Sequence, residues 1–126
     1  METILVICDD PRSQWATRVR RILEPAGYDV IAASGPNAMN VLRTRKPGLV
    51  VLDICLPGRS GADHCCQIRG ESKDVPLLVL SAIRDVAAVV LLLKLGADGY
   101  ITEPFSPFEF LARVRAAIRH SKVQQS

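Results

Sequence analysis

The sequence predicts an α/β protein in which five parallel strands form one doubly wound sheet with helices on both faces. Three observations lead to this prediction. The 126 residues are enough for one compact domain with a single sheet. Short aliphatic segments alternate with longer segments of helical periodicity, which is typical of repeated β–α units. The aliphatic segments also lack period-two alternation, as expected of strands that are buried on both faces of a parallel sheet.

The first two β–α units follow this pattern closely. Residues 4–8 form an aliphatic strand segment, and Asp9-Asp10-Pro11 then opens a helix, because a proline in the first turn gives up no hydrogen bond. A proline and a glycine end this helix. The second unit consists of a short strand over residues 29–32 and a helix that starts at residues 34–36.

The three remaining units repeat the pattern after breaks at proline or glycine. Their strands are predicted at residues 49–52, 77–80 and 99–101. Their helices are predicted over residues 62–69 and 86–95 and from residues 106–107 onward. Residues 121–126 are polar, so we expect a domain over residues 1–120 followed by a frayed tail or the start of a linker.

Acidic and hydroxyl side chains follow the strands that are expected at the centre of the sheet. Asp9 and Asp10 come after the first strand, Asp53 after the third and Ser81 after the fourth. In a doubly wound sheet the carboxyl ends of the strands share one edge, where ligands bind. Gathered carboxylates repel one another unless a hard divalent cation neutralises them. We therefore expect a Mg²⁺ site at which one of the aspartates can act as a nucleophile toward phosphorus.

The overall composition restricts the protein class. A net charge of +3 without a clustered basic stripe gives little support for direct nucleic-acid binding. Four cysteines without a signal peptide indicate a reducing, cytoplasmic compartment, and no apolar stretch is long enough to cross a membrane. A zinc site at His64, Cys65 and Cys66 is disfavoured, because neighbouring helix positions point in different directions.

The residues at the strand ends form an ordered pattern along nearly the whole chain. The pattern consists of Asp9-Asp10, Asp53 with Pro57 and Gly61, Ser81-Ala82, residues 96–100 and Glu103-Pro104-Phe105. This pattern resembles the receiver domain of two-component response regulators. Residues 104–116 resemble the OmpR/PhoB-like subgroup, whose output is a winged-helix DNA-binding domain that is absent from this chain.

The resemblance implies a fold and a set of roles. It implies a flavodoxin/CheY-like (βα)5 fold with strand order 2-1-3-4-5, and a phosphoacceptor role for Asp53 toward a sensor histidine kinase. It implies that Asp9, Asp10, Asp53 and the backbone carbonyl of Cys55 hold Mg²⁺. It also implies that the Ser81 hydroxyl binds the phosphoryl group and that Tyr100 changes rotamer with it, in a regulatory domain that is not an enzyme in its own right.

One departure from the family pattern concerns Glu103, which stands where the family normally has lysine. A carboxylate here would repel a phosphoryl dianion, whereas the lysine ammonium would pair with it. The alternative is that Glu103 turns to solvent or pairs with a nearby arginine. The Glu103-Pro104 bond is expected to be cis, as in the family.

A second departure concerns the face through which the subgroup dimerises, made by the fourth helix, fifth strand and fifth helix. Asp98 and Arg113 are retained as one charged pair, whereas Val89 stands where a basic residue is common. The fourth helix is apolar on every side, which predicts an apolar dimer or partner contact that includes Val89 and Leu92.

Three other functions were weighed. A pseudo-receiver that binds a partner without phosphorylation is favoured by Glu103. A magnesium phosphatase would need a general acid two residues after its nucleophile, where this chain has Cys55. A flavodoxin-like cofactor binder would need a phosphate-binding loop after the first strand, where Asp9 and Asp10 would repel phosphate.

Overall fold

Five parallel strands alternate with five helices along residues 2–54 and 59–125, the part of the chain that the computed structural model describes. The strands are β1 (Thr3–Ile7), β2 (Asp29–Ala33), β3 (Leu49–Ile54), β4 (Leu77–Ser81) and β5 (Gly99–Thr102). The helices are α1 (Gln14–Leu23), α2 (Gly35–Arg45), α3 (Arg59–Glu71), α4 (Val86–Lys94) and α5 (Pro107–Gln125). The strand order is β2-β1-β3-β4-β5, so the predicted fold class and strand order are confirmed.

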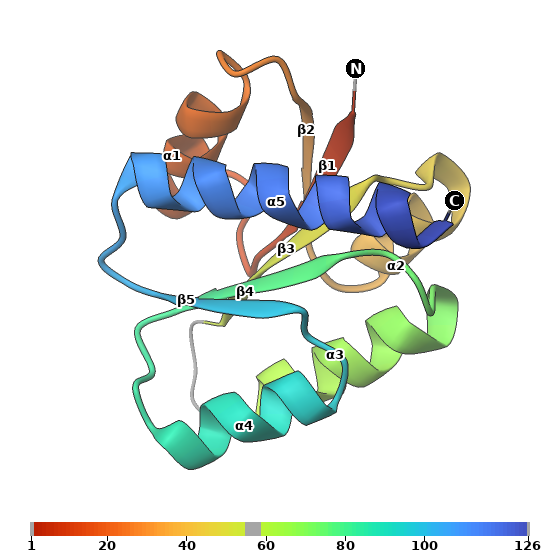
Figure 1. The fold of residues 1–126 in the computed structure, drawn as a ribbon, viewed down its shortest axis with the longest axis vertical. Coiled ribbons are helices and arrows are strands. Elements are labelled where there is room, and N and C mark those ends of the chain that lie inside the picture. The colour runs from red at the N-terminus through yellow and green to blue at the C-terminus, as the bar shows by residue number, and fades with distance from the viewer. Residues whose placement is uncertain (1, 55–58, 126) are drawn as a thin grey trace.

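Two layers of helices enclose the sheet, with α1 and α5 on one face and α2, α3 and α4 on the other (Figure 1). The central strand β3 explains why the strand segments lack alternation. Val50 and Leu52 pack into the core on the α2–α4 side, whereas Leu49 and Val51 pack into the core on the α1–α5 side, and all four are fully buried. Each such side chain contributes about 1.5–3 kcal/mol through burial.

Helix α1 begins later than the sequence indicated. Its N-cap is Ser13, whose hydroxyl accepts a hydrogen bond from the amide of Ala16 at 3.1 Å. Asp10 precedes the helix in a turn, where its carboxylate accepts from the amide of Arg12 at 2.9 Å. The prediction that Asp9-Asp10-Pro11 opens the helix is therefore wrong, because serine satisfies the free amides of the first turn.

Helix α5 also differs from its expected length. It continues to Gln125, through most of the segment that was expected to be a frayed tail or linker after residue 120. Phe110, Val114 and Ile118 anchor the helix on the sheet. The position of the domain boundary stays a prediction.

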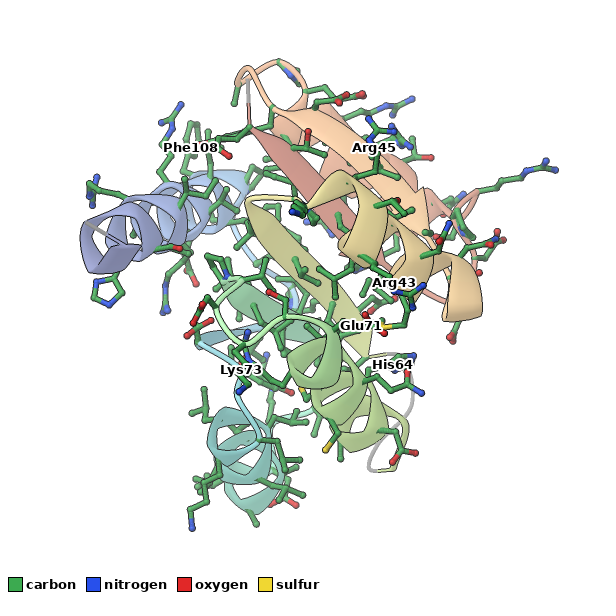
Figure 2. All side chains as sticks on the ribbon, turned by 90° about the vertical axis from the view of Figure 1, so that its right-hand side faces the viewer. Arg43, Arg45, His64, Glu71, Lys73 and Phe108 are labelled. Atoms are coloured by element: carbon green, nitrogen blue, oxygen red, sulfur yellow. The ribbon has the colours of Figure 1, made fainter. Side chains whose placement is uncertain are left out.

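Two arginines tie the helices of the α2–α4 layer together. The Arg43 guanidinium on α2 donates two hydrogen bonds to the Glu71 carboxylate at the end of α3, at 3.2 and 3.0 Å (Figure 2). This pairing lowers the pKa of Glu71. Arg69 on α3 reaches in the other direction and donates to the carbonyl of Gly96 after α4, at 2.6 Å. No helix within residues 2–54 and 59–125 is long and apolar enough to cross a membrane.

Candidate phosphoacceptor site

Asp53 is the next-to-last residue of β3, at the carboxyl edge of the sheet. In the register of the sheet Asp53 is level with Leu80, so Ser81 at the end of β4 is level with Ile54. The Asp53 side chain is half-buried, whereas Ser81 is fully buried. The predicted nucleophile and the predicted hydroxyl group therefore end adjacent strands, as the parallel topology requires.

The charges of the three aspartates act on the thiol of Cys8, the residue that follows β1. Burial is the largest cause that raises the pKa of Cys8 to about 11, and the charges of Asp53, Asp10 and Asp9 raise it further. Asp9 and Asp10 directly follow Cys8 in the chain. Because β1 and β3 are adjacent parallel strands, the segment after β1 and the end of β3 lie at the same edge of the sheet, and they carry the three predicted metal-binding residues.

These carboxylates do not form a ready-made metal cage. Among the described residues no group of three or more His, Cys, Asp and Glu side chains is close enough to hold a metal ion. The Asp10 carboxylate is bound to the amide of Arg12, and Cys55 lies outside the described residues. Carboxylate oxygens are ligands that Mg²⁺ prefers, so the chemistry of these side chains fits this ion.

A chain of hydrogen bonds leads from the end of β3 to Tyr100 on β5. The Ser81 hydroxyl donates to the carbonyl of Ile54 at 3.3 Å and accepts from the amide of Ile83 at 3.0 Å. The Tyr100 hydroxyl donates to the carbonyl of the same Ile83 at 2.7 Å, and its ring packs on the α2–α4 core. The loop between β4 and α4 is therefore held from both sides by the two residues that were predicted to act together.

Glu103 follows β5 in a cis peptide bond with Pro104, as expected. Its backbone amide donates to the carbonyl of Ser81 at 2.8 Å. Its carboxylate accepts a hydrogen bond of 2.6 Å from the indole N–H of Trp15 on α1. Neither alternative expected for this side chain is correct: it is half-buried, and the guanidinium of Arg84 contacts the backbone carbonyl of Glu103 at 3.4 Å instead of the carboxylate.

The structure also corrects the prediction for the face formed by α4, β5 and α5. Leu92 is only 6% exposed and packs in the core, so it cannot take part in a surface contact as predicted. Val89 is half-buried. The exposed apolar side chains of α4 are instead Val86, Val90, Leu91 and Leu93.

Asp98 has partners within its own chain. Its carboxylate accepts from Arg69 at 3.1 Å and from the amide of Leu77 at 2.8 Å. A pair between Asp98 and Arg113 of two copies stays a prediction.

Sequence reasoning missed two residues whose hydrogen bonds join distant segments of the chain: Trp15, next to Glu103, and Arg69, near the amino ends of β4 and β5. Trp15 was assigned no role, although it binds Glu103 across 88 positions of sequence. Arg69 was read only as the end of a helix, yet it donates to five backbone or side-chain acceptors. A half-buried Trp on an otherwise arginine-rich helix was the one signal that could have pointed to Trp15, because an indole N–H needs an acceptor.

Comparison with known proteins agrees with this geometry. The model of the response regulator receiver domain matches residues 4–115. Bacillus subtilis PhoP, an alkaline phosphatase synthesis transcriptional regulatory protein, is 43% identical over 124 residues, which is 98% of this chain and 51% of PhoP. The DNA-binding response regulator MtrA of Mycolicibacterium smegmatis is 40% identical over 122 residues, or 96% of this chain and 52% of MtrA. The chain thus spans about half the length of these curated relatives.

Solved structures give the same assignment. The BeF3-activated N-terminal receiver domain of Klebsiella pneumoniae RstA is 33% identical, with a TM-score of 0.81, and the match covers 93% of this chain and 98% of that one. The receiver domain of the Francisella response regulator 1452 is 27% identical, with a TM-score of 0.84 and coverage of 96% and 99%. The relatives named here include regulators of the OmpR/PhoB type. The chain therefore belongs to the response regulator receiver domain family of two-component systems.

Proposed function

We propose that this chain accepts a phosphoryl group on Asp53 from a sensor histidine kinase and thereby regulates an output domain. The observation that carries the proposal is that Asp9 and Asp10 after β1, Asp53 on β3 and Ser81 on β4 lie at the carboxyl ends of three adjacent strands. Asp9, Asp10 and Asp53 would hold Mg²⁺, together with the backbone carbonyl of Cys55. When bound, this ion would neutralise the carboxylates and the charge on the transferring phosphoryl group.

The transfer is a displacement at phosphorus. A carboxylate oxygen of Asp53 attacks the phosphorus of a phosphohistidine, an O–P bond forms and the P–N bond breaks. The imidazole nitrogen of the kinase keeps the electron pair of the broken bond and takes up a proton. The product is an acyl phosphate on Asp53, so the chain acts as a phosphoacceptor and assists only its own phosphorylation and dephosphorylation.

The hydrogen bonds of Ser81 and Tyr100 would couple phosphorylation of Asp53 to a change at the surface of the domain. A phosphoryl oxygen beside Asp53 would compete with the carbonyl of Ile54 for the Ser81 hydroxyl. Withdrawal of that hydroxyl would loosen the loop at Ile83, which also accepts from Tyr100. The resulting shift would move α4, because α4 begins immediately after this loop.

The exposed apolar side chains of α4 support a dimer contact on the α4–β5–α5 face, formed with a second copy of the chain. In the whole protein this contact would control transcription through a DNA-binding domain, as the names of the relatives suggest. We expect such a protein to act in the cytoplasm. The receiver domain would make no direct contact with nucleic acid.

Intact mass spectrometry tests the proposal. The chain is incubated with a small phosphodonor such as acetyl phosphate, with and without Mg²⁺, and compared with Asp53→Asn. We expect one added phosphoryl group that requires both Mg²⁺ and Asp53. A chain that gains no mass with Mg²⁺, or an Asp53→Asn variant that gains the same mass, would contradict the proposal.

A pseudo-receiver that binds its partner without phosphorylation is the second candidate. The observation that favours it is Glu103, because no lysine occupies the position next to the cis proline. This candidate predicts that Asp53→Asn leaves partner binding and oligomeric state unchanged, and that Mg²⁺ with phosphodonor has no effect on either.

A further inference from the structure

The backbone and the side chain of Glu103 are held by different parts of the molecule. The backbone amide donates to the carbonyl of Ser81 at 2.8 Å, which fixes residue 103 beside the end of β4. The carboxylate accepts from the indole N–H of Trp15 at 2.6 Å, which fixes the charge against α1. The residue therefore borders the phosphoacceptor site while its carboxylate is bound elsewhere.

Trp15 and Glu103 line a cavity of about 430 Å³. The other lining residues are Gln14, Arg18, Ala82 and Pro104. Because Ala82 directly follows Ser81, the cavity reaches the loop that follows the phosphoacceptor edge. The indole and the carboxylate are both half-buried, and a hydrogen bond to an ionised acceptor at this distance is of the strong, charge-assisted kind.

A carboxylate that was free to turn toward Asp53 would oppose an incoming phosphoryl dianion. We propose that Trp15 is a positioning residue that holds the Glu103 carboxylate on the α1 side, so that phosphoryl acceptance at Asp53 proceeds without the cation expected at position 103. This inference rests on the function proposed above. In this arrangement the chain compensates for the absence of a lysine by removing the repulsion between the Glu103 carboxylate and the phosphoryl group. It does not replace the attraction that a lysine would supply.

Binding of beryllofluoride with Mg²⁺, followed by ¹⁹F NMR titration, tests the inference without using Trp15 as the reporter. Trp15→Phe keeps an aromatic ring on the core but removes the N–H, so the freed carboxylate should weaken binding about tenfold. Glu103→Gln should bind within about twofold of the wild type, because the carboxylate is already held away. The double variant should recover the affinity of Glu103→Gln, because a neutral amide cannot repel the ligand.

Tyr28→Phe is the matched control, since Tyr28 packs on the same core face as Trp15 and lies away from the site. We expect Tyr28→Phe to leave binding unchanged, and thermal melting checks that all variants are folded. Wild-type affinity in Trp15→Phe, or a double variant as weak as Trp15→Phe alone, overturns the inference. If the wild type and Glu103→Gln both fail to bind beryllofluoride, the proposed function fails and this inference fails with it.

Discussion

Cys8 reports the electrostatics of the site at the scale of a single residue. Its thiol is buried, and its pKa is raised to about 11 by burial first and then by the charges of Asp53, Asp10 and Asp9. Cys65 on α3 has a pKa raised to about 11 as well, mainly by burial, whereas Cys66 is exposed. A raised thiol pKa means that the neutral form persists well above neutral pH, and only the thiolate is an effective nucleophile.

Alkylation rates should therefore separate the cysteines. In a Cys55→Ser background at about pH 8, we expect iodoacetamide to modify Cys66 at least about tenfold faster than Cys8 or Cys65, measured by peptide mass mapping. The slow sites should gain reactivity as the pH approaches their raised pKa. Equal rates at Cys8 and Cys66 would contradict the burial of the Cys8 thiol and the raised pKa that follows from it.

The residue scale also shows where sequence reasoning succeeds and where it ends. Asp53 and Ser81 were placed at the ends of adjacent strands because parallel topology brings strand ends together whatever the side chains around them. Tyr100 was singled out only by the family resemblance, and the roles of all three residues stay predictions. The partner of Glu103 was not identified, because Trp15 lies on a helix at the other end of the chain, and the choice among solvent, arginine and indole depends on tertiary packing. Leu92 was misassigned for a related reason: residues 86–93 of α4 are all apolar, so periodicity could not tell its buried side from its exposed side.

At the scale of elements, Arg69 joins α3 to the turns before β4 and after α4. Its guanidinium donates to the carbonyls of Ser72, Lys73, Val75 and Gly96 and to the Asp98 carboxylate. Gly96 has φ of 117°, a left-handed conformation that favours glycine, and an added Cβ would lie 2.7 Å from the Arg69 side chain. We call this set of Arg69 hydrogen bonds the Arg69 clamp. It depends on the planar guanidinium of Arg69 and on a glycine at position 96.

Arg69→Lys should expose how much this guanidinium contributes. A lysine keeps the charge but cannot span the same acceptors, so we expect a loss of about 2 kcal/mol in the free energy of unfolding, measured with urea. Gln67→Lys, at an exposed position of the same helix, is the matched control and should change the free energy of unfolding by less than about 0.5 kcal/mol. A stability of Arg69→Lys equal to that of the wild type would contradict the Arg69 clamp.

Helix α4 carries the prediction about association. Leu91 is 50% exposed on a helix that also exposes Val86, Val90 and Leu93. If this surface forms the dimer contact, Leu91→Lys should shift the molecule toward the monomer in sedimentation or light scattering, because a buried lysine loses its hydration. Gln67→Lys again serves as the control. An oligomeric state that Leu91→Lys leaves unchanged would rule out α4 as the contact.

The positions of the helices and strands were largely predictable from the sequence, and the errors concern the residues at which helices begin and end. All ten elements lie where apolar segments and breakers placed them, because a strand buried on both faces leaves a strong aliphatic signature. The start of α1 was wrong because Asp and Ser both cap helices, and only the tertiary structure shows that Asp10 is used in the preceding turn. The end of α5 was missed because polar residues in a last turn resemble a tail.

In the whole molecule, one sheet separates two cores and gathers the carboxyl ends of its strands at one edge. The helices on both faces hold the strands in register, so the strand ends bring together residues that are far apart in sequence. The family follows from this arrangement together with the match over residues 4–115. The chain covers about half the length of these curated relatives, so the output domain and the partners of the whole protein are proposed and not shown.

The central claim is that Asp53 becomes an acyl phosphate, and site mapping of that bond tests it most directly. After incubation with Mg²⁺ and acetyl phosphate, borohydride reduces an aspartyl phosphate to homoserine, which peptide mass spectrometry locates by residue number. We predict homoserine at position 53, dependent on Mg²⁺. Homoserine at another aspartate, or none at position 53 in a chain that has gained a phosphoryl group, would contradict the account.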